Sequence, residues 1–158
     1  MFAASKVLSQ NFHWVVGLAA VADAFAATVS SDVVSMKDAI AATFWLHKAV
    51  GATGTSTITV EACDDTVPTT TSAIAFKYRA NTATDVWGAL TNATSSGFAT
   101  TAGSNQNYEI TVDADQLANS GYGYVRLKCV EVVDSPVLGG IFIQLHLTKP
   151  RAITPTQI

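Results

Sequence analysis

The amino-acid sequence predicts an all-β fold, an antiparallel, jelly-roll-like β-sandwich with extended N- and C-terminal arms. Apolar and polar residues alternate in several short segments, as they do in strands with one buried and one solvated face. No sustained helical period follows position 30, so the crossover helices of a parallel α/β sheet are missing. Two antiparallel sheets of this kind must cover their apolar faces with each other, and a small barrel is the alternative arrangement.

The clearest alternation lies in residues 40–47. We expect Ile40, Ala42, Phe44 and Leu46 on the buried face, and Thr43, Trp45 and His47 on the outer face. Further segments with the same alternation are predicted to be strands: 57–63, 74–79, 108–113, 125–129 and 141–147. In the first of these segments, Ile58 and Val60 are expected to point inward and Glu61 outward.

The remaining elements are short. Residues 81–107 are rich in Thr, Ala, Ser, Gly and Asn, with short strands predicted at 86–87 and 98–101. Residues 114–118 are predicted to form one helical turn, which Asn119-Ser120-Gly121 closes.

A chain of 158 residues has the size of a single domain. We divide it into an N-terminal arm (1–30), a β-sandwich domain (31–148) and a C-terminal arm (149–158).

The two arms differ in composition from the sandwich. Up to Trp14 the chain carries scattered large residues without a clean period, and residues 15–29 suit either a helix or an extended edge strand. Pro150 and Pro155 exclude both a helix interior and a central strand near the C-terminus. Apolar residues in such arms are expected to fold back on the domain or to dock on a neighbour.

Composition excludes several classes of function. Only 13% of the residues are charged and the net charge is -3, too little positive charge to hold a polyphosphate backbone. We therefore expect no direct contact with nucleic acid. The apolar run 15–29 contains Asp23 and is shorter than the roughly 20 residues that span a bilayer. It is also a poor signal peptide, so we expect a soluble, unprocessed protein that contacts no membrane.

Cys63 and Cys129 lie inside predicted strands and not in a close pair. We interpret them as two reduced, buried thiols, with a cross-strand disulfide as the alternative.

No group of residues indicates catalysis, a metal site or a cofactor. The histidines, His13, His47 and His146, lie far apart and lack a second ligand at metal-binding spacing. Asp64-Asp65 is expected to form a turn, and Asp113-Ala114-Asp115 lacks the Gly and Glu of a calcium loop. The sequence contains neither a nucleophile elbow nor a Gly-rich phosphate-binding loop.

The tryptophans allow three interpretations. Trp14, Trp45 and Trp87, together with Tyr122, can fill the core, form a protein interface, or stack on sugar rings. The sequence leaves these interpretations open.

Several stretches carry a resemblance to a known family. They are Phe76-Lys77-Tyr78-Arg79, Trp87, residues 107–117 (NYEITVDADQL), 121–128 (GYGYVRLK), 131–140 (EVVDSPVLGG) and Pro150-Arg151. In their order, over roughly residues 35–152, the chain resembles the decoration, or cement, proteins of tailed-bacteriophage capsids.

The resemblance implies a non-enzymatic virion protein that is assembled in the host cytoplasm. It would bind the outside of the major capsid protein lattice, stabilise the head and associate with itself as a dimer or trimer. The residues expected at capsid or subunit contacts are Phe2, Val7, Leu8, Phe12, Trp14, Trp45, Trp87, Tyr122, Arg151 and Ile153. The alternative is a tail or head-fibre jelly-roll module that binds glycans or another virion protein.

Overall fold

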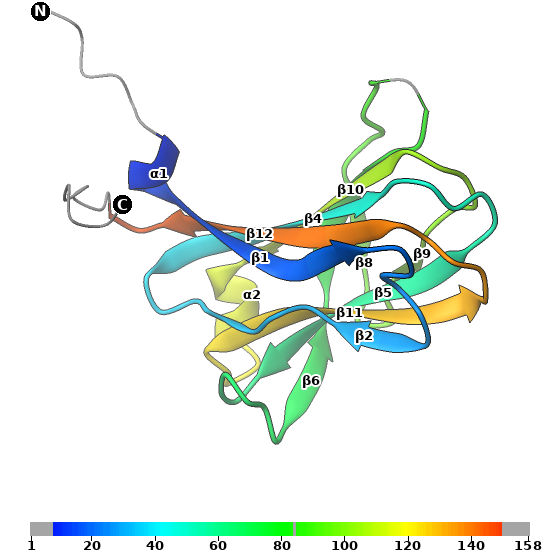
Figure 1. Ribbon diagram of the computed structural model, residues 1–158. Helices are drawn as coiled ribbons and strands as arrows, with labels where there is room; N and C mark the ends of the chain where they lie inside the picture. Colours follow the sequence, from blue (N-terminus) through cyan, green and yellow to red (C-terminus); the bar gives the residue numbers. More distant parts are fainter. Residues whose placement is uncertain (1–7, 84, 150–158) are drawn as a thin grey trace, which may run out of the picture.

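The computed structural model describes residues 8–83 and 85–149. They form two antiparallel sheets that pack face to face, which confirms the predicted all-β sandwich (Figure 1). Sheet A has the strand order β1-β12-β4-β10-β7-β8. Sheet B has the order β2-β11-β5-β6, with β3 also paired to β11 and β9 to β5. The jelly-roll connectivity stays a prediction.

The strands are β1 (Phe12–Val21), β2 (Thr28–Ser30), β3 (Val34–Ser35), β4 (Ala39–Lys48), β5 (Thr55–Cys63), β6 (Thr71–Ile74), β7 (Phe76–Asn81), β8 (Thr91–Ala93), β9 (Phe98–Ala99), β10 (Gln106–Asp113), β11 (Tyr124–Val133) and β12 (Gly139–Leu147). Two short helices, α1 (Leu8–Asn11) and α2 (Ala114–Ala118), complete the described chain.

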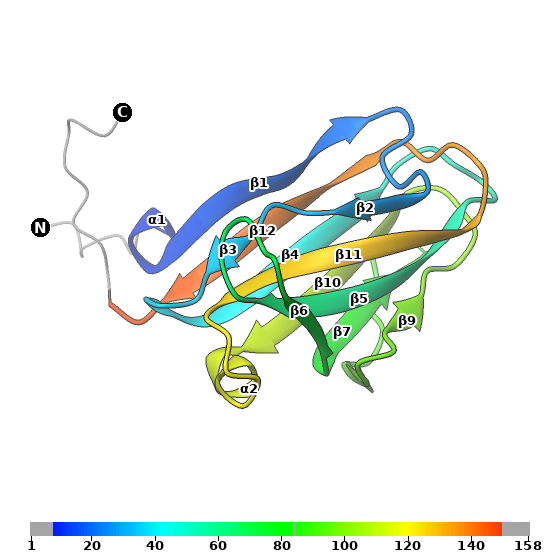
Figure 2. The ribbon, with the colours of Figure 1, turned by 90° about the horizontal axis from the view of Figure 1, so that it is seen from below.

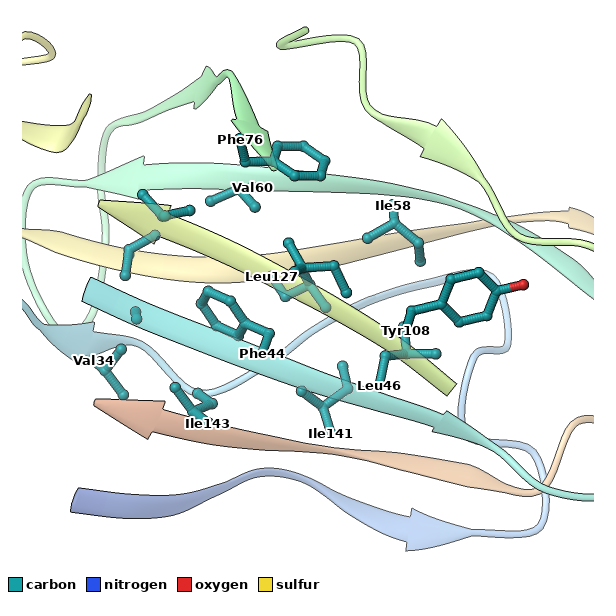
Figure 3. Packing of buried hydrophobic residues seen from close by; sticks show 14 of the residues in the cluster. Val34, Phe44, Leu46, Ile58, Val60, Phe76, Tyr108, Leu127, Ile141 and Ile143 are labelled. Carbon is teal, nitrogen blue, oxygen red and sulfur yellow. The ribbon is translucent and has the colours of Figure 1, made fainter. Parts of the chain in front are cut away.

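The core lies between the two sheets and follows the predicted alternation. On β4, Ala42, Phe44 and Leu46 are fully or almost fully buried, and they belong to the same cluster as Val60 and Leu127 of sheet B (Figure 3). Each large side chain removed from water in this way contributes roughly 1.5–3 kcal/mol to the free energy of folding. The sheets therefore hold each other through their inner faces.

The strands predicted at 40–47, 57–63, 108–113, 125–129 and 141–147 are confirmed, as is the helical turn at 114–118, which is α2. The prediction of one strand at 74–79 is wrong, because the chain crosses between the sheets at Ala75, which separates β6 in sheet B from β7 in sheet A. Of the two predicted short strands, only 98–101 contains one, β9, whereas Val86 and Trp87 lie in a loop. The short strands β3 and β8 were not predicted. Gly97 precedes β9 with φ of 75°, and a Cβ there would collide with the carbonyl oxygen of Ile58, so this approach to β5 needs glycine.

The predicted inward orientation of Ile40 is wrong, because 46% of its surface is exposed and Ala39 is buried instead. The register between β12 and β4 shifts between His146 and Leu147, which pairs Leu147 with Ala39. This irregularity displaces the alternation by one residue at the start of β4.

The predicted N-terminal arm is too long. Residues 12–21 form β1, which pairs with β12, and residues 28–30 form β2, which pairs with β11. Of the two alternatives for residues 15–29, helix or extended edge strand, the structure shows strand, with turns between β1 and β2. Most of β1 is exposed, and its pairing shifts after Val16 and again after Leu18. An edge position and these shifts explain why the sequence shows no clean period there.

Both ends of the described chain lie at the same end of the sandwich. Phe12 at the start of β1 pairs with His146 near the end of β12, and α1 continues β1 outward (Figures 1 and 2). Thr148, just beyond β12, donates its backbone N–H to the carbonyl oxygen of Asp38 at 2.9 Å. The predicted C-terminal arm lies outside the described residues from position 150 onward.

The core predicts the cost of truncation. Phe44→Ala should lower the free energy of unfolding by about 3–5 kcal/mol, because it leaves a cavity between the sheets. Urea unfolding followed by circular dichroism measures this. Ile40→Ala on the same strand, at a half-exposed position, is the control and should cost less than about 1 kcal/mol. Equal losses for both variants would contradict the described packing.

Candidate functional site

The outer side of sheet A carries a row of side chains that crosses five neighbouring strands. The register of the strands pairs Val16 of β1 with Phe142 of β12, and Phe142 in turn with Trp45 of β4. On the other side of Trp45 the row continues with Glu109 of β10 and then Arg79 of β7. Trp87 stands against this row from the loop between β7 and β8, 6.0 Å from Trp45 between ring centroids. A parallel row begins with Trp14 and Gln144.

We call Trp14, Val16, Trp45, Trp87 and Phe142 the aromatic face. Three of its members are unusually open to solvent: Trp14 is 47%, Val16 55% and Phe142 50% exposed. Trp45 and Trp87 are half-buried. Exposed apolar side chains that gather on one side of a sheet are typical of an interaction surface.

The two inner tryptophans are held in place by polar neighbours. Trp45 donates its indole N–H to Oε1 of Gln144 at 3.1 Å. The Arg79 guanidinium lies over the Trp87 ring, 4.9 Å from its centroid, and its Nε donates to Glu109 Oε2 at 2.7 Å. These contacts orient the rings before any partner arrives, so little side-chain entropy remains to be lost on binding.

The structure brings together only some of the predicted contact residues. Trp14, Trp45 and Trp87 share the aromatic face, and Phe12 adjoins it with its ring 4.8 Å from that of His146. Tyr122 lies elsewhere, in a groove beside α2 that it lines with Met36 and Leu117. Leu8 belongs to α1. The remaining predicted residues, Phe2, Val7, Arg151 and Ile153, lie outside the described part of the chain.

Phe142 and Val16 were missed by the sequence analysis. In the alternating segment 141–147, Phe142 shares the outward positions with Gln144 and His146. Its exposure could therefore have been predicted from this alternation. Val16 could not be found in the same way, because its strand shows no clean period.

Sheet B carries a compact charged cluster. Glu61 is almost buried and accepts hydrogen bonds from Arg126 Nε at 2.8 Å and from Lys128 Nζ at 3.0 Å. Burial acts to raise the pKa of Glu61, but the hydrogen bonds and positive charges of the two cations outweigh it and hold the pKa below its ordinary value. Glu61 shares the outer face with Arg126 and Lys128, as expected, but its side chain is buried and not exposed to solvent.

Lys48 is buried at the loop end of the sandwich, where Nζ donates to the carbonyl oxygens of Gly54 at 2.8 Å and Thr101 at 2.7 Å. Burial lowers the pKa of this lysine. Its hydrogen bonds join the end of β4 to two separate loops, which indicates a structural role.

The expected turn and core roles of other candidate residues are confirmed. Asp64 caps its turn by accepting from the backbone N–H groups of Thr69 at 3.0 Å and Thr70 at 3.1 Å, and the Thr69 hydroxyl is the largest cause of its lowered pKa. Cys63 and Cys129 are free, buried thiols. Burial raises the pKa of Cys129 to about 12.

The described residues contain no group of three or more His, Cys, Asp or Glu side chains placed to hold a metal ion. A groove of about 490 Å³ is lined by residues of β1 and β12, among them Val15, Leu145 and Leu147. His13 and Asp32 also line it. Among the described helices, none has the length and apolar character needed to cross a bilayer.

Comparisons with protein-family models, with curated proteins and with solved structures found no match.

The charged cluster predicts a pH effect. Glu61→Gln should destabilise the protein by about 2 kcal/mol at neutral pH, because it removes the partner of two cations. Since the folded pKa is lowered, the stabilisation by Glu61 is present above its ordinary pKa of 4.5 and is lost as the pH falls through the folded value. The variant should therefore show a flatter rise of unfolding free energy with pH below about 4.5, measured by urea titrations.

Thr57→Ala, on the same strand, is the control for this effect. It removes no ionisable group, so the pH slope of the wild type should be retained. An unchanged slope in Glu61→Gln would show that the cluster does not contribute to acid stability.

Proposed function

We propose that the protein is a non-enzymatic structural protein of a tailed-bacteriophage virion, which binds the outer surface of the major capsid lattice and stabilises the head. The aromatic face carries this proposal. It presents half-exposed Trp14, Val16 and Phe142 on a six-stranded sheet whose other side is the core. A partner that covers these side chains gains roughly 1.5–3 kcal/mol for each one that it buries fully.

The type of surface suits a repeated protein lattice. Charges on the outer side of sheet A are paired with each other, as Arg79 is with Glu109, so the face offers apolar contact with little net charge. Each copy on a lattice needs only a modest interface, because the same contact is repeated over the shell. The resemblance of residues 35–152 to capsid decoration proteins supports the same partner.

A glycan-binding module is the second candidate, and the half-exposed rings of Trp14 and Phe142 favour it. Sugar sites combine such rings with polar groups that are free to bind hydroxyls. Here the Trp45 indole N–H is already bonded to Gln144, and Arg79 already covers one ring and pairs with Glu109. The polar partners are thus engaged within the face, which places the protein-binding proposal first.

The first proposal predicts a stabilised head. Phage heads made without the protein should release their DNA at a lower temperature, and purified protein added back should restore the wild-type release temperature. Phe142→Asp should bind such heads at least about tenfold more weakly, because a charge would be buried at the contact. Co-sedimentation of protein with heads measures the affinity, and dye fluorescence during heating measures DNA release.

Val132→Asp is the matched control, since Val132 is 60% exposed on β11 of sheet B. It should bind as the wild type does. Equal DNA release with and without the protein, or equal binding by the two variants, would contradict the proposal. Electron microscopy of the particle adds an independent reading, because density on the tail in place of the head lattice would exclude capsid decoration.

The second candidate predicts binding on a glycan array that Trp45→Ala and Trp87→Ala abolish, because stacking needs the rings. Signals that persist in both variants, or no signal from the wild type, would eliminate it. Thermal unfolding of both variants controls for loss of fold.

A further inference from the structure

Among the strands of the described chain, β1 forms the only long free edge. The sheet orders end at β1 and β8 in sheet A, and at β2 and β6 in sheet B. Strands β2 and β8 each have three residues and β6 has four, whereas β1 has ten. Short edge strands protect a sheet from pairing with another chain, and a long edge strand invites it.

The sequence of β1 lacks the charged residues and prolines that commonly protect a long edge. It reads FHWVVGLAAV, with no Lys, Arg, Asp, Glu or Pro. Its regular part runs from Phe12 to Val16, where pairing with β12 is continuous from His146 to Phe142. From Gly17 onward the strand is tied toward the other layer, because the carbonyl oxygen of Gly17 accepts the N–H of Asp32 at 2.7 Å.

We infer that the protein dimerises by pairing Phe12–Val16 antiparallel with the same residues of a second copy, about a twofold axis near Trp14. The pairing satisfies the unpaired backbone groups of both edges and joins the two copies of sheet A into one continuous sheet. An antiparallel strand pair with a twofold axis is self-complementary, so one patch serves both copies and the assembly closes.

Charge favours a copy of the same chain as the occupant of this edge. Strand β1 carries no Lys, Arg, Asp or Glu. A second copy of Phe12–Val16 is equally uncharged, so the two strands can pair without like charges facing each other.

The exposed side chains of β1 add to the contact. In the single chain, about half of the surface of Trp14 and of Val16 is exposed to solvent, and Val16 pairs with Phe142. In the dimer, the Trp14 side chains of the two copies become cross-strand neighbours with Cβ atoms about 4.5–5.5 Å apart. Aromatic pairs across strands stabilise such pairing.

A charge within the strand pair tests the interface. The wild type should sediment as a dimer at high concentration, and Val16→Lys should raise the dimer dissociation constant at least about tenfold, because it would set an ammonium group opposite the apolar Phe12 of the second copy. Val132→Lys makes the same change at a similarly exposed valine of sheet B and should dimerise as the wild type does. Circular dichroism spectra like that of the wild type would show that both variants are folded.

A cross-link tests the register. Trp14→Cys should join covalently to its copy with a short bis-maleimide, and Val132→Cys should not. Cys63 and Cys129 are buried, and burial raises the pKa of both thiols, so they do not compete for the reagent.

A monomeric wild type at every concentration would overturn the inference, as would a dimer that Val16→Lys leaves intact. This inference is independent of the proposed function. A monomer that still binds phage heads would leave the proposed function standing, and a dimer that binds no heads would leave the dimer standing.

Discussion

The structure depends on the alternation of side chains along the strands of sheet A, because the same strands supply both the core and the aromatic face. Phe44 is buried between the sheets, and its register partners Ile110 and Ile143 are buried with it. The next residue on β4, Trp45, must then point outward. A slip of one residue would move the core side chains to the surface and the aromatic face into the interior. The hydrophobic core therefore fixes the position of the surface rings.

Most of the sandwich could be predicted from the sequence, since strands that lie between two neighbours alternate cleanly. The failures lie at edges and irregularities. β1 is exposed along most of its length and shifts register, so its pattern carries little information. Ile40 sits where the register between β12 and β4 changes, and no local pattern reveals a shift that another strand imposes.

The candidate surface was predictable in part. The tryptophans could be named from the sequence, but their common face depends on strand order, which periodicity does not contain. Trp87 shows this limit most clearly. It lies in a loop, and it belongs to the face because its ring contacts both Trp45 on β4 and Arg79 on β7. These two strands lie on either side of β10, and this strand order cannot be seen in the sequence. Tyr122, an aromatic residue of similar appearance in the sequence, lies beside α2 in a different groove.

Electrostatics determine which kind of contact each sheet offers. On sheet B, Glu61 pairs with Arg126 and Lys128, which places a cluster of charged groups on that sheet. On sheet A, the pair between Arg79 and Glu109 neutralises the charges next to the rings. Contact through sheet A therefore gains its free energy from apolar burial, which salt screens little, and steering by charge contributes little to the rate of association.

The position of β1 links the two proposals physically. This strand forms the free edge of sheet A and also carries Trp14 and Val16, which form one side of the aromatic face. Pairing two copies through this edge would place two aromatic faces on one continuous sheet. Each face then raises the effective concentration of the other at a repeated surface, so two weak contacts hold more tightly than either does alone. The geometry of the joined sheet decides whether both faces reach the partner together, because avidity is lost when they cannot bind at the same time.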